Sequence, residues 1–258
     1  MTAKYSIRKE AIAGSFYPEN EEKIIDFIHF VENTKADAIN KLLKSIDGQN
    51  INGLIVPHAG WIYSGRTALM AYKILEAIKP AEIALLGPSH KFPINRILAD
   101  EHNYWSTPLG LIKLLKDHHY EKNITYHAYE HSLEVQAPFI KYCSDGSSIL
   151  PLLVGEVSDG SAADCAQHLY DNQYFTIIST DLSHYNPLEI AKQKDIVSIN
   201  SIQNNSSLNL DACGRNPLKI AYEFNRLHNT KPRLIDYSTS AEISGDTNNV
   251  VGYASFWF

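Results

Sequence analysis

The sequence predicts an α/β fold in three layers, in which a mostly parallel, mixed central sheet is flanked by helices. Two observations support this class. Short apolar segments of strand length alternate along the chain with longer segments whose apolar residues recur at helical spacing. The chain has 258 residues, of which 44% are hydrophobic and 20% charged, so it can bury a large core. Because no repeat or Gly/Ser linker divides it, we expect a single domain over residues 1–258.

The first half of the chain contains one clear β-α-β pattern. A helix is predicted over about 21–43, followed by a strand at 51–57. A second helix at 65–79 then leads to a strand at 81–87. Two strands joined by a crossover helix run parallel, so these two strands are expected to be parallel members of one sheet.

The second half continues the alternation. It contains a helical segment, a strand, a helix and a strand, followed by two helices and two late strands: 130–143, 147–155, 159–172, 174–180, about 187–203, 214–228, 232–240 and 249–258. This order of elements is typical of a layered α/β sheet.

Composition excludes several classes of function. The net charge of -6, the pI near 6.0 and the lack of a dense Lys/Arg cluster argue against nucleic-acid binding. No segment approaches the ~20 apolar residues that span a bilayer, and the N-terminus has no signal-peptide core. Three widely separated cysteines fit a reducing compartment better than a disulfide framework. We therefore expect a cytoplasmic protein with no membrane or nucleic-acid partner.

Three histidines follow predicted strands. His58 ends LIVPH, His90 ends ALLGPSH, and His184 lies in STDLSHY. In open α/β sheets, ligands bind outside the carboxyl ends of the strands, where the loops meet. A single histidine at such a position is often a structural, hydrogen-bonded residue. Three in the same context favour convergence on a metal or a substrate.

Two histidines and one anionic ligand are a common way to hold a metal while leaving positions open for substrate. Three carboxylates are candidates for the anionic ligand: Asp181, Glu130 and Glu134. The alternative is the thiolate of Cys213, which precedes a Gly and a Pro at a predicted helix start. There the helix dipole is expected to lower the thiol pKa. Cys143 and Cys165 lie within amphipathic helices, which indicates core packing.

Two further patterns suggest proton transfer. Asp181 precedes His184 by three residues, so its carboxylate could orient the imidazole and raise its basicity, or the two could form a structural pair. In EHSLEVQ, Glu130 and Glu134 are four residues apart on one helical face, with His131 beside them. The alternative explanation is that acidic residues open a helix because its dipole favours them. The candidate catalytic residues are therefore His184, Asp181 and His131.

Seven segments, taken in order, resemble a known family: AGSFYP, VPHAGWIYSGRTALMAY, LLGPSH, EHSLEVQAPF, STDLSHY, CGRNP and VGYASFWF. The chain from about residue 10 onward resembles the Memo family, whose bacterial and archaeal members are called AmmeMemoRadiSam system protein B. The resemblance implies a fold like that of class III extradiol dioxygenases. It also implies a non-haem metal site with ligands His58, His90 and Cys213, in a pocket that Asp181 and His184 line.

The third ligand position departs from the pattern of the dioxygenases. Extradiol dioxygenases hold Fe(II) with two histidines and a carboxylate, whereas Cys213 stands at the third position here. A thiolate is a softer ligand and can itself be oxidised. We expect a divalent metal, Fe(II) first, with Zn or Cu as alternatives, and we predict no organic cofactor.

Two functional hypotheses follow. The first is a non-haem metal-dependent oxidoreductase of the dioxygenase type that acts on a small molecule, with His184, oriented by Asp181, as general acid or base. The second is a non-catalytic metal- or peptide-binding partner in a radical-SAM-associated modification system. Its partners would then be a radical-SAM enzyme and an AMMECR-type protein, and the aromatic residues Trp61, Tyr63 and Tyr185 would serve recognition.

Overall fold

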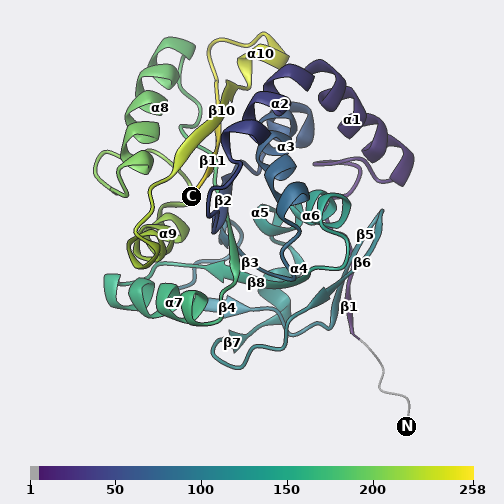
Figure 1. Ribbon diagram of the computed structural model, residues 1–258, viewed down its shortest axis with the longest axis vertical. Coiled ribbons are helices and arrows are strands. Elements are labelled where there is room, and N and C mark those ends of the chain that lie inside the picture. The colour runs from purple at the N-terminus through teal and green to yellow at the C-terminus, as the bar shows by residue number, and fades with distance from the viewer. Residues whose placement is uncertain (1–5) are drawn as a thin grey trace.

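The computed structural model describes residues 6–258, which form an α/β structure around one 11-stranded mixed sheet (Figure 1). The strands are β1 (Ile7–Arg8), β2 (Gly53–Val56), β3 (Glu82–Pro88), β4 (Ile97–Ala99), β5 (Tyr104–Thr107), β6 (Gly110–Leu114), β7 (Glu121–Lys122), β8 (Ser148–Val154), β9 (Phe175–Ser179), β10 (Arg233–Thr239) and β11 (Gly252–Trp257). The helices are α1 (Glu21–Thr34), α2 (Ala36–Ser45), α3 (Trp61–Ile78), α4 (Ile124–Ala128), α5 (His131–Glu134), α6 (Ala137–Cys143), α7 (Asp159–Asp171), α8 (Leu188–Gln203), α9 (Arg215–His228) and α10 (Ala241–Ser244). The predicted fold class is confirmed.

The centre of the sheet is parallel. Strands β8, β3, β9 and β2 lie side by side in that order and run in the same direction. These strands are buried on both faces, which explains why they are continuous apolar runs in the sequence. On the far side of β2, strand β11 pairs antiparallel with β2, and β10 pairs antiparallel with β11. The β2-α3-β3 unit is present, but β9 lies between its two strands. The sequence did not predict this order, because a hydrophobic pattern does not specify which strands pair.

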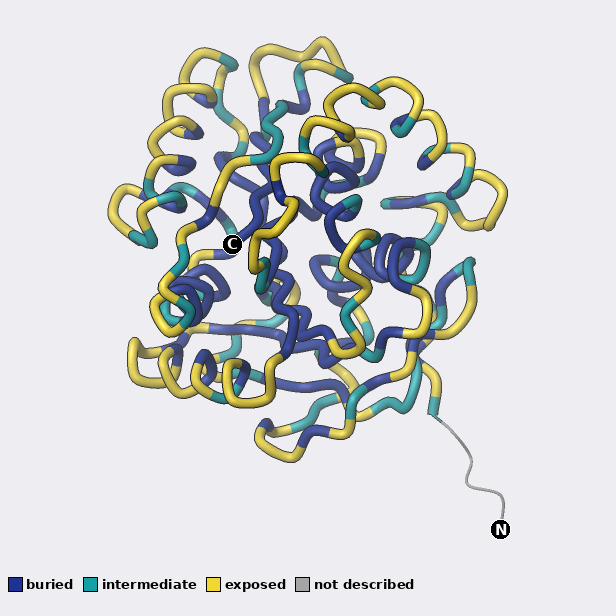
Figure 2. The backbone as a smooth tube through the Cα atoms, viewed as in Figure 1, coloured by how far each residue is buried: buried dark blue, intermediate teal, exposed yellow. Residues whose placement is uncertain are grey.

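Helices cover both faces of the sheet (Figure 1). Residues of α1, α3, α5 and α6 form one hydrophobic cluster with the sheet, and residues of α7, α8 and α9 form the other. Side chains alternate along each strand, so Leu54 and Val56 enter the first cluster and Ile55 enters the second. Figure 2 shows the result, with buried strands inside and exposed outer faces on the surrounding helices.

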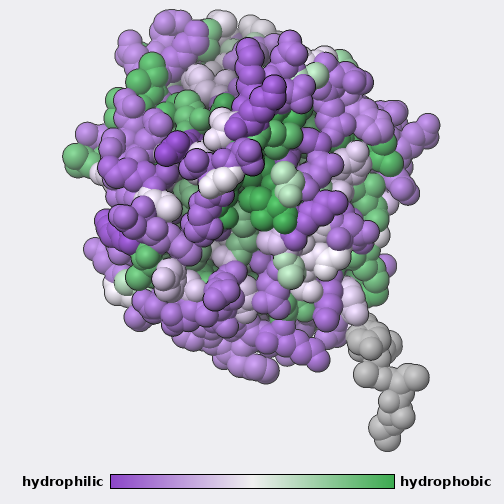
Figure 3. All heavy atoms as spheres, viewed as in Figure 1, coloured by the Kyte–Doolittle hydropathy of each residue, from purple (hydrophilic) through white to green (hydrophobic). Residues whose placement is uncertain are grey.

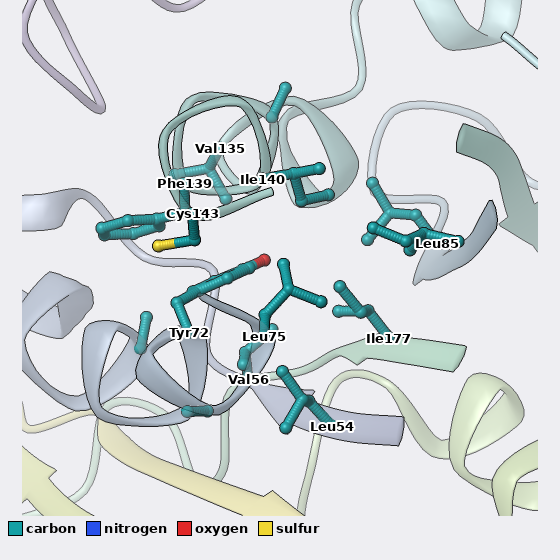
Figure 4. Close-up of a cluster of buried hydrophobic side chains, with 14 of the residues drawn as sticks. Leu54, Val56, Tyr72, Leu75, Leu85, Val135, Phe139, Ile140, Cys143 and Ile177 are labelled. Atoms are coloured by element: carbon teal, nitrogen blue, oxygen red, sulfur yellow. The ribbon is translucent and has the colours of Figure 1, made fainter. Parts of the chain in front are cut away.

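The first cluster contains a stack of aromatic rings (Figure 4). Phe139 of α6 lies 3.7 Å from Trp61 and 4.9 Å from Tyr72 of α3, measured between ring centroids, with interplanar angles of 12° and 21°. Below the rings, the cluster continues through Leu54 of β2 and Ile177 of β9. This stack anchors α3 and α6 to the central strands, and both helices begin close to the strand ends.

Some predicted elements differ in detail. The helix expected over 21–43 is two helices, α1 and α2, separated at Lys35, whose side chain pairs with Asp236 of β10. The helix expected over 130–143 is likewise divided into α5 and α6. Strands β1 and β4 to β7 were not predicted, because, unlike the equally short β2 and β9, none of them is a continuous buried run of four or five mainly apolar residues.

The surface is largely hydrophilic, although hydrophobic residues gather near the centre of the face seen in Figure 3. Among residues 6–258, no helix has both the length and the apolar character needed to cross a membrane.

Replacement of Phe139 by Ala should strongly destabilise the fold. The side chain is 1% exposed and stacks on two aromatic rings, so its removal leaves a cavity. We expect the free energy of unfolding to fall by about 3–5 kcal/mol, measured by urea denaturation. Phe30→Ala is the matched control, because Phe30 is 49% exposed and its removal should cost far less. Equal losses in the two variants would contradict the packing described here.

Candidate metal centre

The loops that follow three central strands lie at the same edge of the sheet. Strands β2, β9 and β3 are neighbours and parallel, so their carboxyl ends lie together. His58 follows the end of β2 by two residues, His90 follows β3 by two, and His184 follows β9 by five. The structure therefore places all three histidines after the carboxyl ends of adjacent strands.

A group of three imidazoles forms at this edge. His58, His90 and His131 each offer a ligand atom, and these atoms all lie within 4.8 Å of one another. The ring centroids are 5.0 Å apart for His58 and His90, and 4.6 Å apart for His90 and His131. His131 comes from the first residue of α5. A group of this size could hold one metal ion.

The orientation of His58 is set by Ser179, the last residue of β9. The Ser179 hydroxyl donates its single proton to the carbonyl of Ser132 at 2.6 Å and accepts from Gln136 Nε2 at 2.9 Å. His58 Nδ1 lies 3.0 Å from the same Ser179 oxygen, so this nitrogen must be the donor. The Nε2 atom of His58 is then the unprotonated nitrogen, and its lone pair faces the site.

Glu130 orients His90 and lies close to His131. Its Oε1 lies 3.0 Å from His90 Nδ1 and 3.3 Å from His131 Nδ1, and its Oε2 accepts from the His90 backbone at 2.7 Å. Burial would raise the pKa of this carboxyl, but hydrogen bonds from His90 and from the backbone of Ser132 lower it to about 2. The ionised carboxylate accepts the Nδ1–H of His90, which leaves the Nε2 of His90 available, whereas its approach to His131 Nδ1 is a charge contact without a hydrogen bond. Such carboxylate–histidine pairs are typical of metal centres.

Gln136 connects this edge to the hydrophobic core. It is fully buried, accepts from Tyr72 at 2.9 Å, and donates to the carbonyl of Pro57 at 2.9 Å as well as to Ser179. Its amide therefore joins α3, the loop after β2 and the end of β9. The position of His58, one residue after Pro57, depends on this amide.

Glu134 is a structural residue in this fold. It forms an ion pair with Arg8 at 2.7 Å, and both side chains are almost fully buried. It also accepts hydrogen bonds from the backbone of Ala11 and Ile12 and from Tyr17. These contacts tie the N-terminal segment to α5 and occupy the carboxylate, which removes Glu134 from the candidate ligands.

Cys213 lies beside His58 but outside the group of three histidines. Its Sγ is 3.1 Å from His58 Nε2 and accepts a hydrogen bond from the Asp181 backbone at 3.3 Å. Donor atoms that share one metal are about 3.5 Å apart, so this separation is compatible with shared coordination. The predicted low thiol pKa is wrong. Burial and the nearby Asp181 carboxylate raise the pKa of the thiol to about 12, because these effects outweigh the dipole of α9, which begins two residues later.

Asp181 binds the backbone of the loop after β2 and not the imidazole of His184, which the three-residue spacing had suggested as its partner. Its Oδ1 accepts from the backbone of His58 at 2.7 Å and of Ala59 at 3.3 Å, and burial raises its pKa to about 6. No hydrogen bond joins it to the side chain of His184 within residues 6–258. Asp181 thus fixes the loop after β2, while His184 stays partly exposed beside Tyr185.

The sequence predicted His131 as a catalytic residue and not as a member of the group of three imidazoles. It did not identify Ser179. The adjacent Glu130 and His131 were a usable signal, because a carboxylate beside a histidine is a common support for a metal ligand. Ser179 carried no signal, since a serine at the end of a strand has many ordinary roles.

The chain belongs to the Memo family. The family model described as Memo-like protein matches residues 8–257, which confirms the family that the sequence motifs predicted.

Relatives match over nearly the whole chain. A MEMO1 family protein of Aquifex aeolicus is 33% identical over 98% of this chain and 99% of its own length. A MEMO1 family protein of Thermoplasma acidophilum is 31% identical, over 96% of this chain and 97% of its own. An uncharacterized protein from Escherichia coli K12 aligns in structure over 81% of this chain and 100% of its own, with 11% identity and a TM-score of 0.44. That likeness is too low to carry an argument.

Gln136→Leu should weaken metal binding although Gln136 lies outside the imidazole group. The change removes the amide that holds Ser179 and the loop before His58, so we expect metal affinity to fall about 10- to 100-fold. Titration with Zn²⁺ or Fe²⁺ measures this. Gln167→Leu, on the exposed side of α7, is the control. Unchanged affinity in a folded Gln136 variant would contradict the role assigned to the amide.

Proposed function

We propose that this Memo family member is a non-haem metal-dependent oxidoreductase of the dioxygenase type, with His58, His90 and Cys213 as the metal ligands. The observation that carries the proposal is the state of the imidazoles. His58 and His90 each have Nδ1 engaged by a buried oxygen, and each keeps Nε2 available at the carboxyl edge of the sheet. Metal-ligating histidines almost always have their other ring N–H held by an oxygen in this way.

The donor set suits a transition metal. Imidazole nitrogens with a thiolate or a third imidazole favour Fe(II), Zn or Cu over Mg or Ca, which prefer oxygen ligands. A bound metal with open positions would supply Lewis acidity and, if it is iron or copper, electron transfer to a substrate. We propose Fe(II) as the native metal, with Zn or Cu as alternatives.

Two further histidines near the site, His131 and His184, are candidates for proton transfer. Burial lowers the pKa of His131 to about 4, so this imidazole is neutral at pH 7. His184 is partly exposed, which gives its ring access to both solvent and the site. We assign His131 and His184 as candidate acid–base groups and Asp181 as the residue that fixes the loop carrying His58.

A cavity beside the centre offers room for a small-molecule substrate. Its volume is about 590 Å³, and it is lined by residues from the loop after β3, from the end of β8 and from the start of α9: Pro88, Ser89, Phe92, Pro93, Ile94, Asn95, Val154, Gly155, Glu156, Cys213 and Asn216. Ser89 is adjacent to His90, and Cys213 contacts His58. A ligand in this cavity would therefore lie next to two of the proposed metal ligands.

A second candidate function has one observation in its favour. Tyr185 is 75% exposed and Tyr63 is 39% exposed, which suits recognition of a peptide by a non-catalytic metal-binding module. Trp61 does not contribute, because it is 2% exposed, stacks on Phe139 and donates to the carbonyl of Val135. Partnership with a radical-SAM enzyme and an AMMECR-type protein belongs to this alternative.

Oxygen uptake distinguishes the two functions. Protein purified without oxygen and loaded with Fe(II) should consume O2 when a small chelating substrate is added, and His184→Ala should slow that uptake without removing the metal. Metal retention with no uptake across a broad panel of small chelating compounds would favour the non-catalytic module.

Loss of either strand-end histidine should remove the metal. We expect His58→Ala and His90→Ala to bind far less metal per chain than the parent, with nearly unchanged far-UV circular dichroism. His29→Ala is the control, because His29 is exposed on α1, away from the imidazole group. Elemental analysis of anaerobically purified protein measures the number of metal ions per chain. Full metal content in both site variants would contradict the proposal.

The pH dependence of metal binding identifies the third ligand. The pKa of the free Cys213 thiol is about 12, so coordination of its thiolate must release one proton. Metal affinity should then rise about tenfold per pH unit between about pH 7 and 9. His58 and His131 add no slope there, because burial lowers both pKa values and the imidazoles are already neutral.

Cys213→Ser provides the comparison for this titration. If Cys213 is a ligand, the serine variant should bind metal more weakly and with a flat pH profile. A flat profile in the parent protein would show instead that His131, and not Cys213, completes the ligand set.

A further inference from the structure

A second cavity lies at the opposite, amino edge of the sheet. Its volume is about 570 Å³, and it is lined by Ile51, Asn52, Ile78, Pro80, Tyr170, Asp171, Gln173, Tyr174, Phe175 and His228. Phe175 is the first residue of β9, and Ser179 at the other end of that strand orients His58. A strand of this length spans ~13 Å from first to last Cα, so the cavity is separate from the candidate metal centre.

Three helices end at this cavity. Ile78 is the last residue of α3, Asp171 the last of α7 and His228 the last of α9. The carboxyl end of a helix carries a partial negative charge, and three such ends act together here. Asp171 adds a full negative charge, and the lining drawn from residues 6–258 contains no Lys or Arg. The cavity therefore favours a positively charged ligand.

Aromatic rings form several of its walls. Tyr170 and His228 meet with their centroids 4.7 Å apart and their planes at 61°, which makes a corner, and Tyr174 and Phe175 also line the cavity. Burial lowers the pKa of His228, so its ring is neutral at pH 7 and does not repel a cation. Aromatic rings arranged around an apolar space attract organic cations through their electron-rich faces.

Two polar atoms on cavity-lining residues also lack partners. Asn52 Nδ2 and His228 Nε2 are buried, and neither has a hydrogen-bond partner within the described part of the chain. Buried polar atoms in folded proteins are almost always paired with protein, water or ligand. Because both atoms have almost no accessible surface, the proposal below does not depend on them.

A bound metal ion explains these features less well. Asp171 is the one carboxylate of the lining, and it accepts from Gln167 at 2.8 Å. Hard cations such as Ca²⁺ or Mg²⁺ require six or more converging oxygen ligands, which a lining with a single carboxylate does not provide.

We propose that this cavity binds a small organic cation of the alkylammonium type, with its charged head among the aromatic rings and near Asp171. The inference is independent of the proposed oxidoreductase function, since it uses none of the residues of the metal centre.

Choline and its neutral isostere, in which a tert-butyl group replaces the trimethylammonium group, test the proposal directly. The two compounds have nearly the same shape and the same hydroxyl group. Isothermal titration of the full chain should give binding of choline at least about tenfold tighter than binding of the isostere. Equal affinities, or no binding of choline at millimolar concentration, would overturn the proposal.

Three variants locate the binding. Tyr170→Leu removes an aromatic wall, and Asp171→Asn removes the charge, so each should weaken choline binding, by about tenfold for the tyrosine. Asp164→Asn is the matched control, because it removes one negative charge from an exposed position of the same helix outside the lining. Loss of binding in the control equal to that in Asp171→Asn would show general electrostatic attraction and overturn the assigned site.

Two further measurements separate this proposal from other outcomes. Metal content should be unchanged in Tyr170→Leu and Asp171→Asn. Failure of the cation-binding proposal can therefore be distinguished from failure of the proposed metal-dependent function. A short peptide that carries trimethyl-lysine should bind no more tightly than choline, and tighter peptide binding would overturn the assignment to a small free cation.

Discussion

The hydroxyl group of Ser179 is the point on which the geometry of the candidate metal centre depends. It is buried at the end of β9 and has one proton, which it donates to Ser132. Because a buried oxygen must have its remaining bonds satisfied by donors, Gln136 and His58 both donate to it. One hydroxyl thus fixes the tautomer of an imidazole that comes from a different strand, and Gln136 passes the constraint on to Tyr72 in the aromatic core.

Burial and charge act together at the same edge. Burial lowers the pKa values of His58 and His131, which keeps these imidazoles neutral and able to donate a lone pair. Glu130 stays ionised because the hydrogen bonds that it accepts outweigh its loss of water. Cys213 differs, since burial and the charge of Asp181 raise the pKa of its thiol to about 12 and keep it protonated at pH 7. The edge therefore presents neutral imidazole nitrogens, and under the proposed function the sulfur of Cys213 would be a ligand whose coordination releases a proton.

The two edges of the parallel sheet differ in electrostatic character because the crossover helices α3, α7 and α9 run opposite to the strands. The edge at which β2, β3 and β9 end holds the three imidazoles. At the other edge, α3, α7 and α9 end beside a cavity with aromatic walls. The same topology that brings histidines together at one edge thus brings the negative ends of helix dipoles together at the other.

The sequence by itself determined the α/β class, most of the long elements, the family, and the presence of His58 and His90 near one edge, because strand-length apolar runs and the residues that follow them are local features. The place of Cys213 near that edge came only from the resemblance to the family. The sequence did not determine that β9 lies between β2 and β3, that Asp181 binds the backbone of His58, or that Glu134 pairs with Arg8. Nor could it determine the thiol pKa of Cys213, which depends on burial. These features join residues that are far apart in the chain, and only the packing of the strands and helices brings them into contact.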